Sequence, residues 1–444
     1  MTDLELAFQA LSGKQEAYDM LWNYYRGKQP LIYTAKRLRD IFKNVDAYFA
    51  ENWCAVVIDA VKERIELADL KLENASAQYV LNMLWQENEM NLESDEVHTA
   101  ALVCGEAFVV VWPDAEGQPQ AFYNDPRLCH VFYEGDNPRR KRFAAKWWVG
   151  DDDRRYLTLY YSDRLEYYVS TGKADNVYTA SAFAPLEEPT APNPYDEIPV
   201  FHFRTQHNII SDLSDVIPIQ DAINKLLTDM MVAAEYGAFP QRWIISSASV
   251  QGKVKNAPNE IMDLPAAEDG MQPTSAGQFS TADLRQFFDA INNLVSAISA
   301  ITRTPHHYFF STGGAPSGEA LIVMESGLNK KTMDRIDRFI PTWQRVGAFM
   351  LKIAGVVVNP LDIEPEFDKV ATIQPRSEAE IEQIKRQTGL LDNQLGVSQE
   401  TILTALGYDA EEEKRRRETE SGDMAETMLT AFDRDGVSEG VVRV

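Results

Sequence analysis

Two amphipathic stretches on either side of a β-rich segment constrain the fold of this chain more than any other feature. Residues 210–237 repeat apolar side chains at helical spacing, with Pro218 at a position suited to a first turn. Residues 281–304 begin at a capping segment that ends at Asp283 and continue as a regular apolar stripe. The stripe consists of Leu284, Phe287, Phe288, Ile291, Leu294, Val295 and Ile298. Because residues 238–280 alternate strand-like runs with Gly and Pro turns, the sequence predicts two long neighbouring helices joined by a small β lobe.

Both helices also have a polar side. On the first helix it comprises Gln220, Asn224, Lys225, Thr228 and Asp229. On the second it comprises Asp283, Gln286, Asp289, Asn292, Asn293, Ser296 and Ser299. The second set is acidic or small and neutral, with Arg285 as the exception on that helix.

A third and longest helix is predicted over residues 319–354. Pro341 lies inside it and predicts a bend, because its ring clashes with the preceding turn and its nitrogen cannot donate. The loop before it, HHYFFSTGGAPSG, combines bulky aromatic residues with a Gly313-Gly314 pair that eases backbone rearrangement. After a strand-like run at residues 363–369, the remaining chain predicts short helices and an exposed, mobile polar tail.

The N-terminal half divides into helices and then strands. Residues 52–67 and 77–90 show helical periodicity. Over residues 107–205, alternating aromatic and β-branched residues between turn residues predict a mostly antiparallel sheet, and the Pro-rich segment 182–199 is expected to be a surface loop. The fold class is therefore predicted to be α+β.

The acidic balance narrows the possible functions. With 68 Asp and Glu against 43 Lys and Arg, the formal net charge is −25, which repels polyphosphate and excludes an ordinary basic DNA-clamping domain. No apolar run reaches the ~18 residues of a membrane span, and the N-terminus has acids where a signal peptide has bases. We therefore expect a protein made in the cytoplasm, without a membrane partner.

The sequence lacks the signatures of a catalytic site. The segment from Gly313 to Glu319 resembles a phosphate-binding loop but has an acid where the lysine is needed. Cys54, Cys104 and Cys129 form no C-x-x-C pair. His306 and His307 are adjacent, so in extended chain they point apart and make a poor metal site. We expect no catalytic residue, no metal and no cofactor.

Two charged runs allow alternative interpretations. Asp151-Asp152-Asp153 is compatible with a Mg²⁺ site of a nuclease, but its position between two predicted strands favours a solvated hairpin turn. The basic run from Arg139 to Arg142 is compatible with contact to nucleic acid or a partner. A charged loop that faces water or a neighbouring subunit is the favoured interpretation.

The order of elements resembles the portal proteins of long-tailed bacteriophages, particularly those of actinobacterial and other Gram-positive hosts. The motifs that contribute are Tyr24-Tyr25-x-Gly27, Gln29-Pro30-Leu31, Asn52-Trp53, Val56-Val57-x-Asp59-Ala60, Glu63-Arg64, HTAALVCG from His98 to Gly105 followed by Phe108-Val109, Ile217-Pro218-x-Gln220-Asp221-Ala222-x-Asn224-Lys225, Pro316-Ser317-Gly318-Glu319-Ala320-Leu321 and Leu406-Gly407-Tyr408. None of them is diagnostic alone, but their order and spacing cover residues 20–420 or so.

The resemblance implies a ring of twelve copies and a division of each copy into named parts. These are a wing at 1–209, a first stem helix at 210–237, a clip at 238–280, a second stem helix at 281–304, a tunnel loop at 305–318, a kinked long helix returning to the wing at 319–376, a crown at 377–421 and a flexible tail at 422–444. This crown is short beside those of longer family members, which leaves its contact with DNA in question.

The resemblance also implies site residues and partners. The tunnel loop nearest the DNA comprises His306, His307, Tyr308, Phe309, Phe310, Ser311, Thr312, Gly313, Gly314 and Ser317. On the second stem helix, Asp283, Gln286, Asp289 and Asn293 are expected to face the channel. The expected partners are other copies of the chain, double-stranded DNA passing through the lumen without sequence-specific binding, the terminase, a head-tail adaptor, and the major capsid and scaffolding proteins.

Other interpretations are also compatible with the sequence of the second helix, of the aromatic loop and of the chain as a whole. The polar side of the second helix is equally compatible with any solvent-facing helix, and the aromatic loop with a plain connector whose rings are buried. The chain as a whole is alternatively another structural protein of the virion, such as a capsid or connector component. A DNA-processing enzyme is a weaker alternative, because it requires a phosphate loop and a convergent acid cluster.

Overall fold

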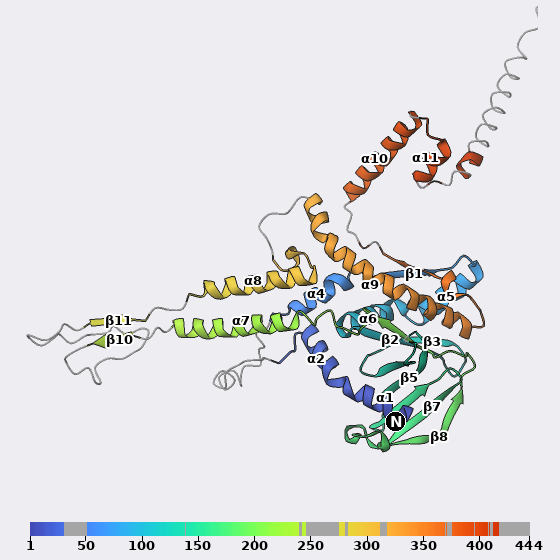
Figure 1. Cartoon of the computed structure of the whole chain (residues 1–444), viewed down its shortest axis with the longest axis horizontal. Helices are drawn as coiled ribbons and strands as arrows, with labels where there is room; N and C mark the ends of the chain where they lie inside the picture. Colours follow the sequence, from blue (N-terminus) through green and yellow to red (C-terminus); the bar gives the residue numbers. More distant parts are fainter. Residues whose placement is uncertain are drawn as a thin grey trace, which may run out of the picture. The chain divides into compact units, whose positions relative to one another are not determined.

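The computed structural model in Figure 1 describes most of the chain. The described residues are 1–30, 51–137, 139–238, 242–245, 275–279, 283–310, 318–368, 370, 375–394, 396–406, 408 and 412–416. The chain forms two compact units, Met1–Ala371 and Thr372–Val444. Several predictions fall outside the described residues: most of the β lobe, the start of the second helix at Thr281, the glycine pair of the loop, and the tail.

In the described part of residues 1–105, five helices come before strand β2 (Glu106–Pro113). They are α1 (Asp3–Gly13), α2 (Gln15–Tyr25), α4 (Trp53–Lys62), α5 (Ala75–Glu87) and α6 (Met90–Cys104). Asn52 begins α4 by accepting the Ala55 amide at 3.2 Å, and Asn74 begins α5 by accepting the Ser76 and Ala77 amides. Two predicted boundaries are wrong: the first helix stops at Lys62, and the second stops at Glu87.

The reason for the first error is long-range pairing. Leu67, which the helical pattern included, begins strand β1 (Leu67–Lys71), and β1 pairs antiparallel with β12 (Glu364–Phe367). That partner lies almost 300 residues later in the chain, so a local periodicity cannot detect it. The predicted strand at residues 363–369 is confirmed by β12.

Antiparallel pairing over residues 107–205 is confirmed, but it builds two sheets. The first has the order β3-β2-β9 and contains β2 (Glu106–Pro113), β3 (Pro119–Asn124) and β9 (Val200–Arg204). The second has the order β4-β5-β6-β7-β8 and contains β4 (Cys129–Tyr133), β5 (Lys141–Val149), β6 (Arg154–Tyr160), β7 (Arg164–Lys173) and β8 (Phe183–Pro192).

Strand β8 contradicts the prediction of a Pro-rich surface loop. Its prolines are tolerated because β8 is the edge strand of the five-stranded sheet, where half of the backbone amides have no strand to pair with. Pro185 lies opposite Tyr168 and Pro192 opposite Arg164 on β7. Most of β8 is exposed, which is the surface character that the sequence indicated.

Three long helices follow: α7 (Ile217–Ala238), α8 (Arg285–Thr302) and α9 (Gly318–Ile353). In Figure 1, α7 and α8 run side by side, and the two helices are in contact. Between them in sequence, β10 (Arg242–Ile245) pairs antiparallel with β11 (Ser275–Gln278), so the described part of the predicted lobe is a β-ladder. Pro218 lies in the first turn of α7, and Pro341 lies inside α9, as predicted.

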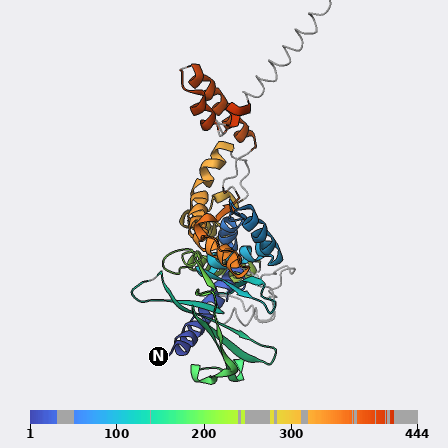
Figure 2. The ribbon, with the colours of Figure 1, turned by 90° about the vertical axis from the view of Figure 1, so that its right-hand side faces the viewer.

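Helix α9 is the centre of the larger unit. Phe339, Trp343, Val346 and Met350 are buried along one face of α9, in a core that also includes residues of α4, α5, α6 and β9. Figure 2 shows the blue helices of residues 53–87 next to the orange α9. The ring of His98 on α6 stacks on Phe339 with centroids 5.2 Å apart, and its Nε2 accepts from Trp343 at 3.0 Å.

The smaller unit is helical in its described part. It contains α10 (Pro375–Gln394) and α11 (Gln399–Ala405), and Ser398 caps α11 by accepting the Thr401 amide at 3.3 Å. Gly389 of α10 lies directly against Ile402 and Leu406. The predicted helical segment near the C-terminus is therefore confirmed. Among the described helices, none is long and apolar enough to cross a bilayer.

Candidate functional site

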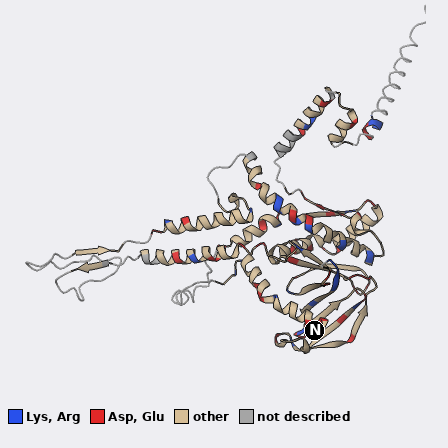
Figure 3. Cartoon of the chain, in the orientation of Figure 1, with Lys and Arg blue, Asp and Glu red and all other residues tan. Residues whose placement is uncertain are grey.

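The exposed side of α8 is the polar side that the sequence identified. Asp283, Gln286, Asp289 and Asn293 are all exposed, at successive spacings of three, three and four residues. Figure 3 shows acidic positions along this helix in red. Asp283 also accepts the Arg285 amide at 3.0 Å and so helps to begin the helix. Within one subunit, these side chains are free to face a solvent-filled space.

The opposite side of α8 is apolar, but only half of it is covered. Ile291, Val295 and Ile298 are buried in the core of the larger unit. Phe288 and Ile301 belong to the same helix, yet 53% and 52% of their surfaces are exposed. The predicted stripe is thus confirmed as a packing surface for Ile291, Val295 and Ile298, whereas Phe288, also predicted in the stripe, is left largely uncovered by the single subunit.

The polar side of α7 is divided: Lys225 and Asp229 form an exposed ion pair, but the other three residues do not face solvent. Gln220, Asn224 and Thr228 lie one turn apart along α7 and are all buried. Gln220 accepts the Trp53 amide at 2.8 Å and donates to the Glu51 carbonyl oxygen at 2.7 Å and to Asn224 Oδ1 at 3.1 Å. A polar stripe can be buried at little cost when each group finds a partner. This stripe therefore fastens α7 to the start of α4.

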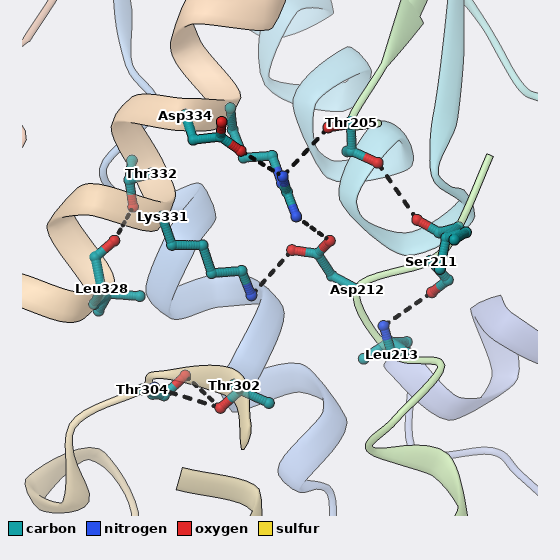
Figure 4. Close-up of polar contacts among 12 residues, drawn as sticks. Thr205, Ser211, Asp212, Leu213, Thr302, Thr304, Leu328, Lys331, Thr332 and Asp334 are labelled. Atoms are coloured by element: carbon teal, nitrogen blue, oxygen red, sulfur yellow. Dashed lines mark hydrogen bonds and ion pairs between the residues drawn. The ribbon is translucent and has the colours of Figure 1, made fainter. Parts of the chain in front are cut away.

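The base of α7 is held to α9 by buried ion pairs. Asp212, five residues before α7, forms an ion pair with Lys331 at 3.0 Å and accepts from Arg335 at 2.8 Å. Only 3% of the Asp212 side chain is exposed, with 14% for Lys331 and 8% for Arg335. Figure 4 shows the Lys331 side chain pointing toward Asp212, with Thr205 nearby. Because Arg335 also donates to the Thr205 carbonyl oxygen, one arginine joins α9 to both ends of segment 205–212.

The described half of the predicted tunnel loop is anchored inside the subunit. Tyr308 accepts from Arg64 at 2.6 Å, and the ring of buried Phe309 packs on Trp53 with centroids 5.5 Å apart. His306 stacks on Phe310, whereas His307 lies 3.6 Å from the Glu325 carboxylate. The neighbouring histidines thus have different partners. Ser311, Thr312, Gly313, Gly314 and Ser317 lie outside the described residues.

The acidic run lies in a single turn, whereas the basic run is divided between a turn and a strand. Asp151, Asp152 and Asp153 form the turn between β5 and β6, which confirms the predicted hairpin. The basic run is dispersed: Arg140 pairs with Glu134, and Arg142 with Asp3. Arg139 and Arg140 lie in an exposed turn, as predicted for a loop that faces water or a neighbouring subunit, whereas Lys141 lies in β5 and donates to the Val200 carbonyl oxygen at 2.7 Å.

Neither a reactive thiol nor a metal-binding cluster is found among the residues that the structure describes. All three cysteines are buried, and burial raises the pKa of Cys54 and of Cys129 to about 12, so both thiols stay protonated near neutral pH. Among the described residues, no group of three or more His, Cys, Asp or Glu side chains is placed to hold a metal ion.

One buried cluster was missed by the sequence analysis. Glu106 is 1% exposed; it accepts from Tyr18 at 2.7 Å and from Lys14 at 3.3 Å, and it lies 2.8 Å from the His202 ring. These ionic contacts hold the Glu106 pKa well below its usual range, although burial alone would raise it. No local pattern indicates this cluster, because its members come from α2, β2, β9 and the turn before α2.

Comparison with known proteins identifies the family. The family model described as "Phage portal protein, SPP1 Gp6-like" matches residues 14–426. The portal protein of Mycobacterium phage L5 is 23% identical over 419 residues, covering 86% of this chain and 82% of the relative. That of Mycobacterium phage D29 is 24% identical over 385 residues, covering 81% of this chain and 76% of the relative.

Solved structures of similar architecture come from gene transfer agent particles. A chain from the neck of an empty particle matches with a TM-score of 0.47 and 13% identity, over 85% of this chain and 95% of that one. A chain from the native virion matches with a TM-score of 0.45, also at 13% identity, with the same coverage. The assignment rests on the sequence family, whose model spans nearly the whole chain: this protein belongs to the SPP1 Gp6-like phage portal proteins, which are structural components of the virion and not enzymes.

Proposed function

We propose that twelve copies of this chain form a ring whose lumen conducts double-stranded DNA, with α7 and α8 as the stem. In this arrangement the face of α8 that contains Asp283, Gln286, Asp289 and Asn293 lines the lumen. The observation that supports it most directly is a difference between the two helices: three polar residues of α7, Gln220, Asn224 and Thr228, make contacts inside the subunit, while the four polar residues of α8 stay exposed.

An acidic and neutral lining suits a conduit because DNA must move through it without being held. Each lysine or arginine that neutralises a phosphate adds affinity and would oppose translocation. A ring of twelve copies, each with a formal charge of −25, would sum to about −300, and at physiological salt the repulsion would act within a Debye length of ~8 Å. Short-range repulsion of this kind centres the duplex in the lumen.

The remaining parts follow from their position relative to the stem. We assign residues 305–318 to a tunnel loop, with 306–310 as its fixed base because Tyr308 and Phe309 are anchored to α4. Residues 238–280 would form the clip that contacts the terminase and later the head-tail adaptor. Residues 1–209 and 319–376 would form the wing toward the capsid and scaffolding proteins, and residues 377–421 the crown.

A charge reversal on α8 tests the lining. Asp289→Lys adds a cation to the exposed face of α8, and Glu187→Lys makes the same charge change on exposed strand β8. We expect both variants to form rings with a central hole in negative-stain images. Only the Asp289→Lys ring should bind a short duplex at physiological salt, with a steep salt dependence, and package DNA more slowly.

The controls separate the two parts of the proposal. Equal duplex binding by the two variants would show that α8 does not line the lumen. A wild-type protein that remains a monomer at all concentrations would contradict the ring itself.

A further inference from the structure

A basic pocket lies between α9 and the end of β9. Its charged lining comprises Arg139, Lys141, Arg204, Arg338 and Arg345, together with His202, and its volume is about 380 Å³. None of the acidic side chains that the structure describes belongs to this lining. In a chain with a net charge of −25, five cations around one cavity without an acid in its lining are a local reversal of the overall charge.

Three of these cations have few contacts of their own. Arg139 and Arg345 are exposed, and neither forms an ion pair with the residues that the structure describes. Arg204 lies over the Tyr133 ring at 5.3 Å, also without an ion pair to a described acid. Such guanidinium groups keep their donors available for a ligand.

The other two cations form the back of the pocket. Arg338 donates to the Thr205 carbonyl oxygen at 2.7 Å and to Asp334 at 2.9 Å, which holds its side chain in place. Lys141 is held by the Val200 carbonyl oxygen, and His202 by Glu106. The side chains at the back of the pocket are thus held in place, and the guanidinium groups at its opening keep donors available. Such donors match an oxyanion that accepts bidentate hydrogen bonds.

We propose that this pocket receives carboxylate side chains from the adjoining copy of the chain in the ring, an inference that rests on the proposed ring. Copies that each carry −25 repel one another, so a closed ring requires local contacts between opposite charges. The chain has 68 Asp and Glu to offer, and the pocket supplies the cationic half of such a contact.

Carboxylates fit better than the phosphates of DNA. A five-cation pocket open to the lumen would grip the duplex, which contradicts the acidic lining that a conduit needs. Between subunits, the same pocket adds affinity without slowing translocation.

Ring assembly tests the proposal. Arg345→Glu reverses one rim charge, and Lys28→Glu makes the same change at an exposed lysine outside the pocket. We expect Arg345→Glu to raise the subunit concentration for half-assembly about tenfold or more at low salt. Because salt screens the repulsion that the new acid creates, assembly of this variant should recover as salt rises. The Lys28→Glu protein should assemble like the wild type.

Zero-length crosslinking gives a second readout that does not depend on a loss of assembly. In the Arg345→Lys variant, a carbodiimide can join the introduced amine to a carboxylate within contact distance. We expect new crosslinks that join two copies, seen as dimers and larger species on a denaturing gel, with an Asp or Glu of the adjoining copy identified by mass spectrometry.

Three outcomes would overturn the inference. The first is equal assembly of wild-type and Arg345→Glu rings, together with crosslinks only within one copy. The second is normal assembly with a loss of duplex binding by the rings, which would make DNA phosphate the occupant. The third is normal rings that fail to enter the capsid, which would make another virion protein the occupant. Each of these differs from failure of the proposed function, in which the wild-type protein forms no ring.

Discussion

The Asp212 cluster permits a quantitative prediction about the anchoring of the stem. Replacing Asp212 by Ala leaves Lys331 and Arg335 without their shared carboxylate, at side-chain exposures of 14% and 8%. Loss of one partner from a buried ion pair costs about 3–5 kcal/mol, mostly because the remaining charge stays desolvated. Arg335 keeps a second contact to Asp334 at 3.0 Å, so we expect a loss near the lower end, about 3 kcal/mol.

Two further variants bracket this value. Asp212→Asn keeps the shape and one acceptor but removes the charge, so its loss should lie between those of Asp212→Ala and a surface control. The control is Asp229→Ala, which breaks an i,i+4 pair with Lys225 whose side chains are 43% and 37% exposed. Exposed pairs of this kind contribute about 0–1 kcal/mol.

Urea unfolding, followed by tryptophan fluorescence, measures these differences. The buried Trp343 lies on α9, the same helix as Lys331 and Arg335, and reports on the packing of that helix. Subunit concentration must be equal for all variants, because assembly contributes to apparent stability. If Asp212→Ala loses under 1 kcal/mol, or no more than Asp229→Ala, the ion pairs do not anchor the stem and the reasoning is refuted.

Two further predictions concern the core. Gly105→Ala should destabilise the protein by at least ~1–3 kcal/mol, because Gly105 has a φ of +85° and an added Cβ would lie 2.8 Å from the Ile210 backbone. The control in the same urea titration is Gly13→Ala, because an added Cβ at Gly13 meets no atom within 4 Å. Burial lowers the pKa of His98 to about 3. Below about pH 6.5 the unfolded chain therefore binds a proton at this histidine, whereas the folded chain does not. The free energy of unfolding should fall by roughly 1.4 kcal/mol per pH unit from pH 6.5 toward pH 3. His98→Gln, which keeps an acceptor for Trp343, should remove that part of the slope, and an unchanged slope would contradict the assignment.

Local periodicity was sufficient to predict the buried residues and the bounds of a helix where one face of that helix meets the core. The apolar residues Ile291, Val295 and Ile298 were identified as one stripe of α8, and they are buried as expected. The bounds of α9 were predicted to within one residue at each end. Both helices are long, so many turns repeat the same signal and errors at single positions do not matter.

Local periodicity failed where distant groups decide burial. Gln220, Asn224 and Thr228 look like a solvent side, but partners on α4 and within α7 satisfy them in the interior. Pro-rich β8 looks like a loop, but the edge of a sheet accepts it. In each case the residue type was read correctly and its environment was not, because that environment includes segments that no local repeat of the sequence indicates.

For this protein, the sequence alone determined the α+β class, the succession of a helical, a β-rich and a second helical region, the long helix pair and the acidic charge, since each depends on composition or on neighbours within a few turns. Only the tertiary structure decided that Asp212 meets Lys331 and Arg335, that Glu106 meets Lys14 and His202, and that scattered cations surround one pocket. Electrostatic contacts act through space over a few ångströms. Their partners are therefore set by how the chain packs, and the spacing of residues along it does not reveal them.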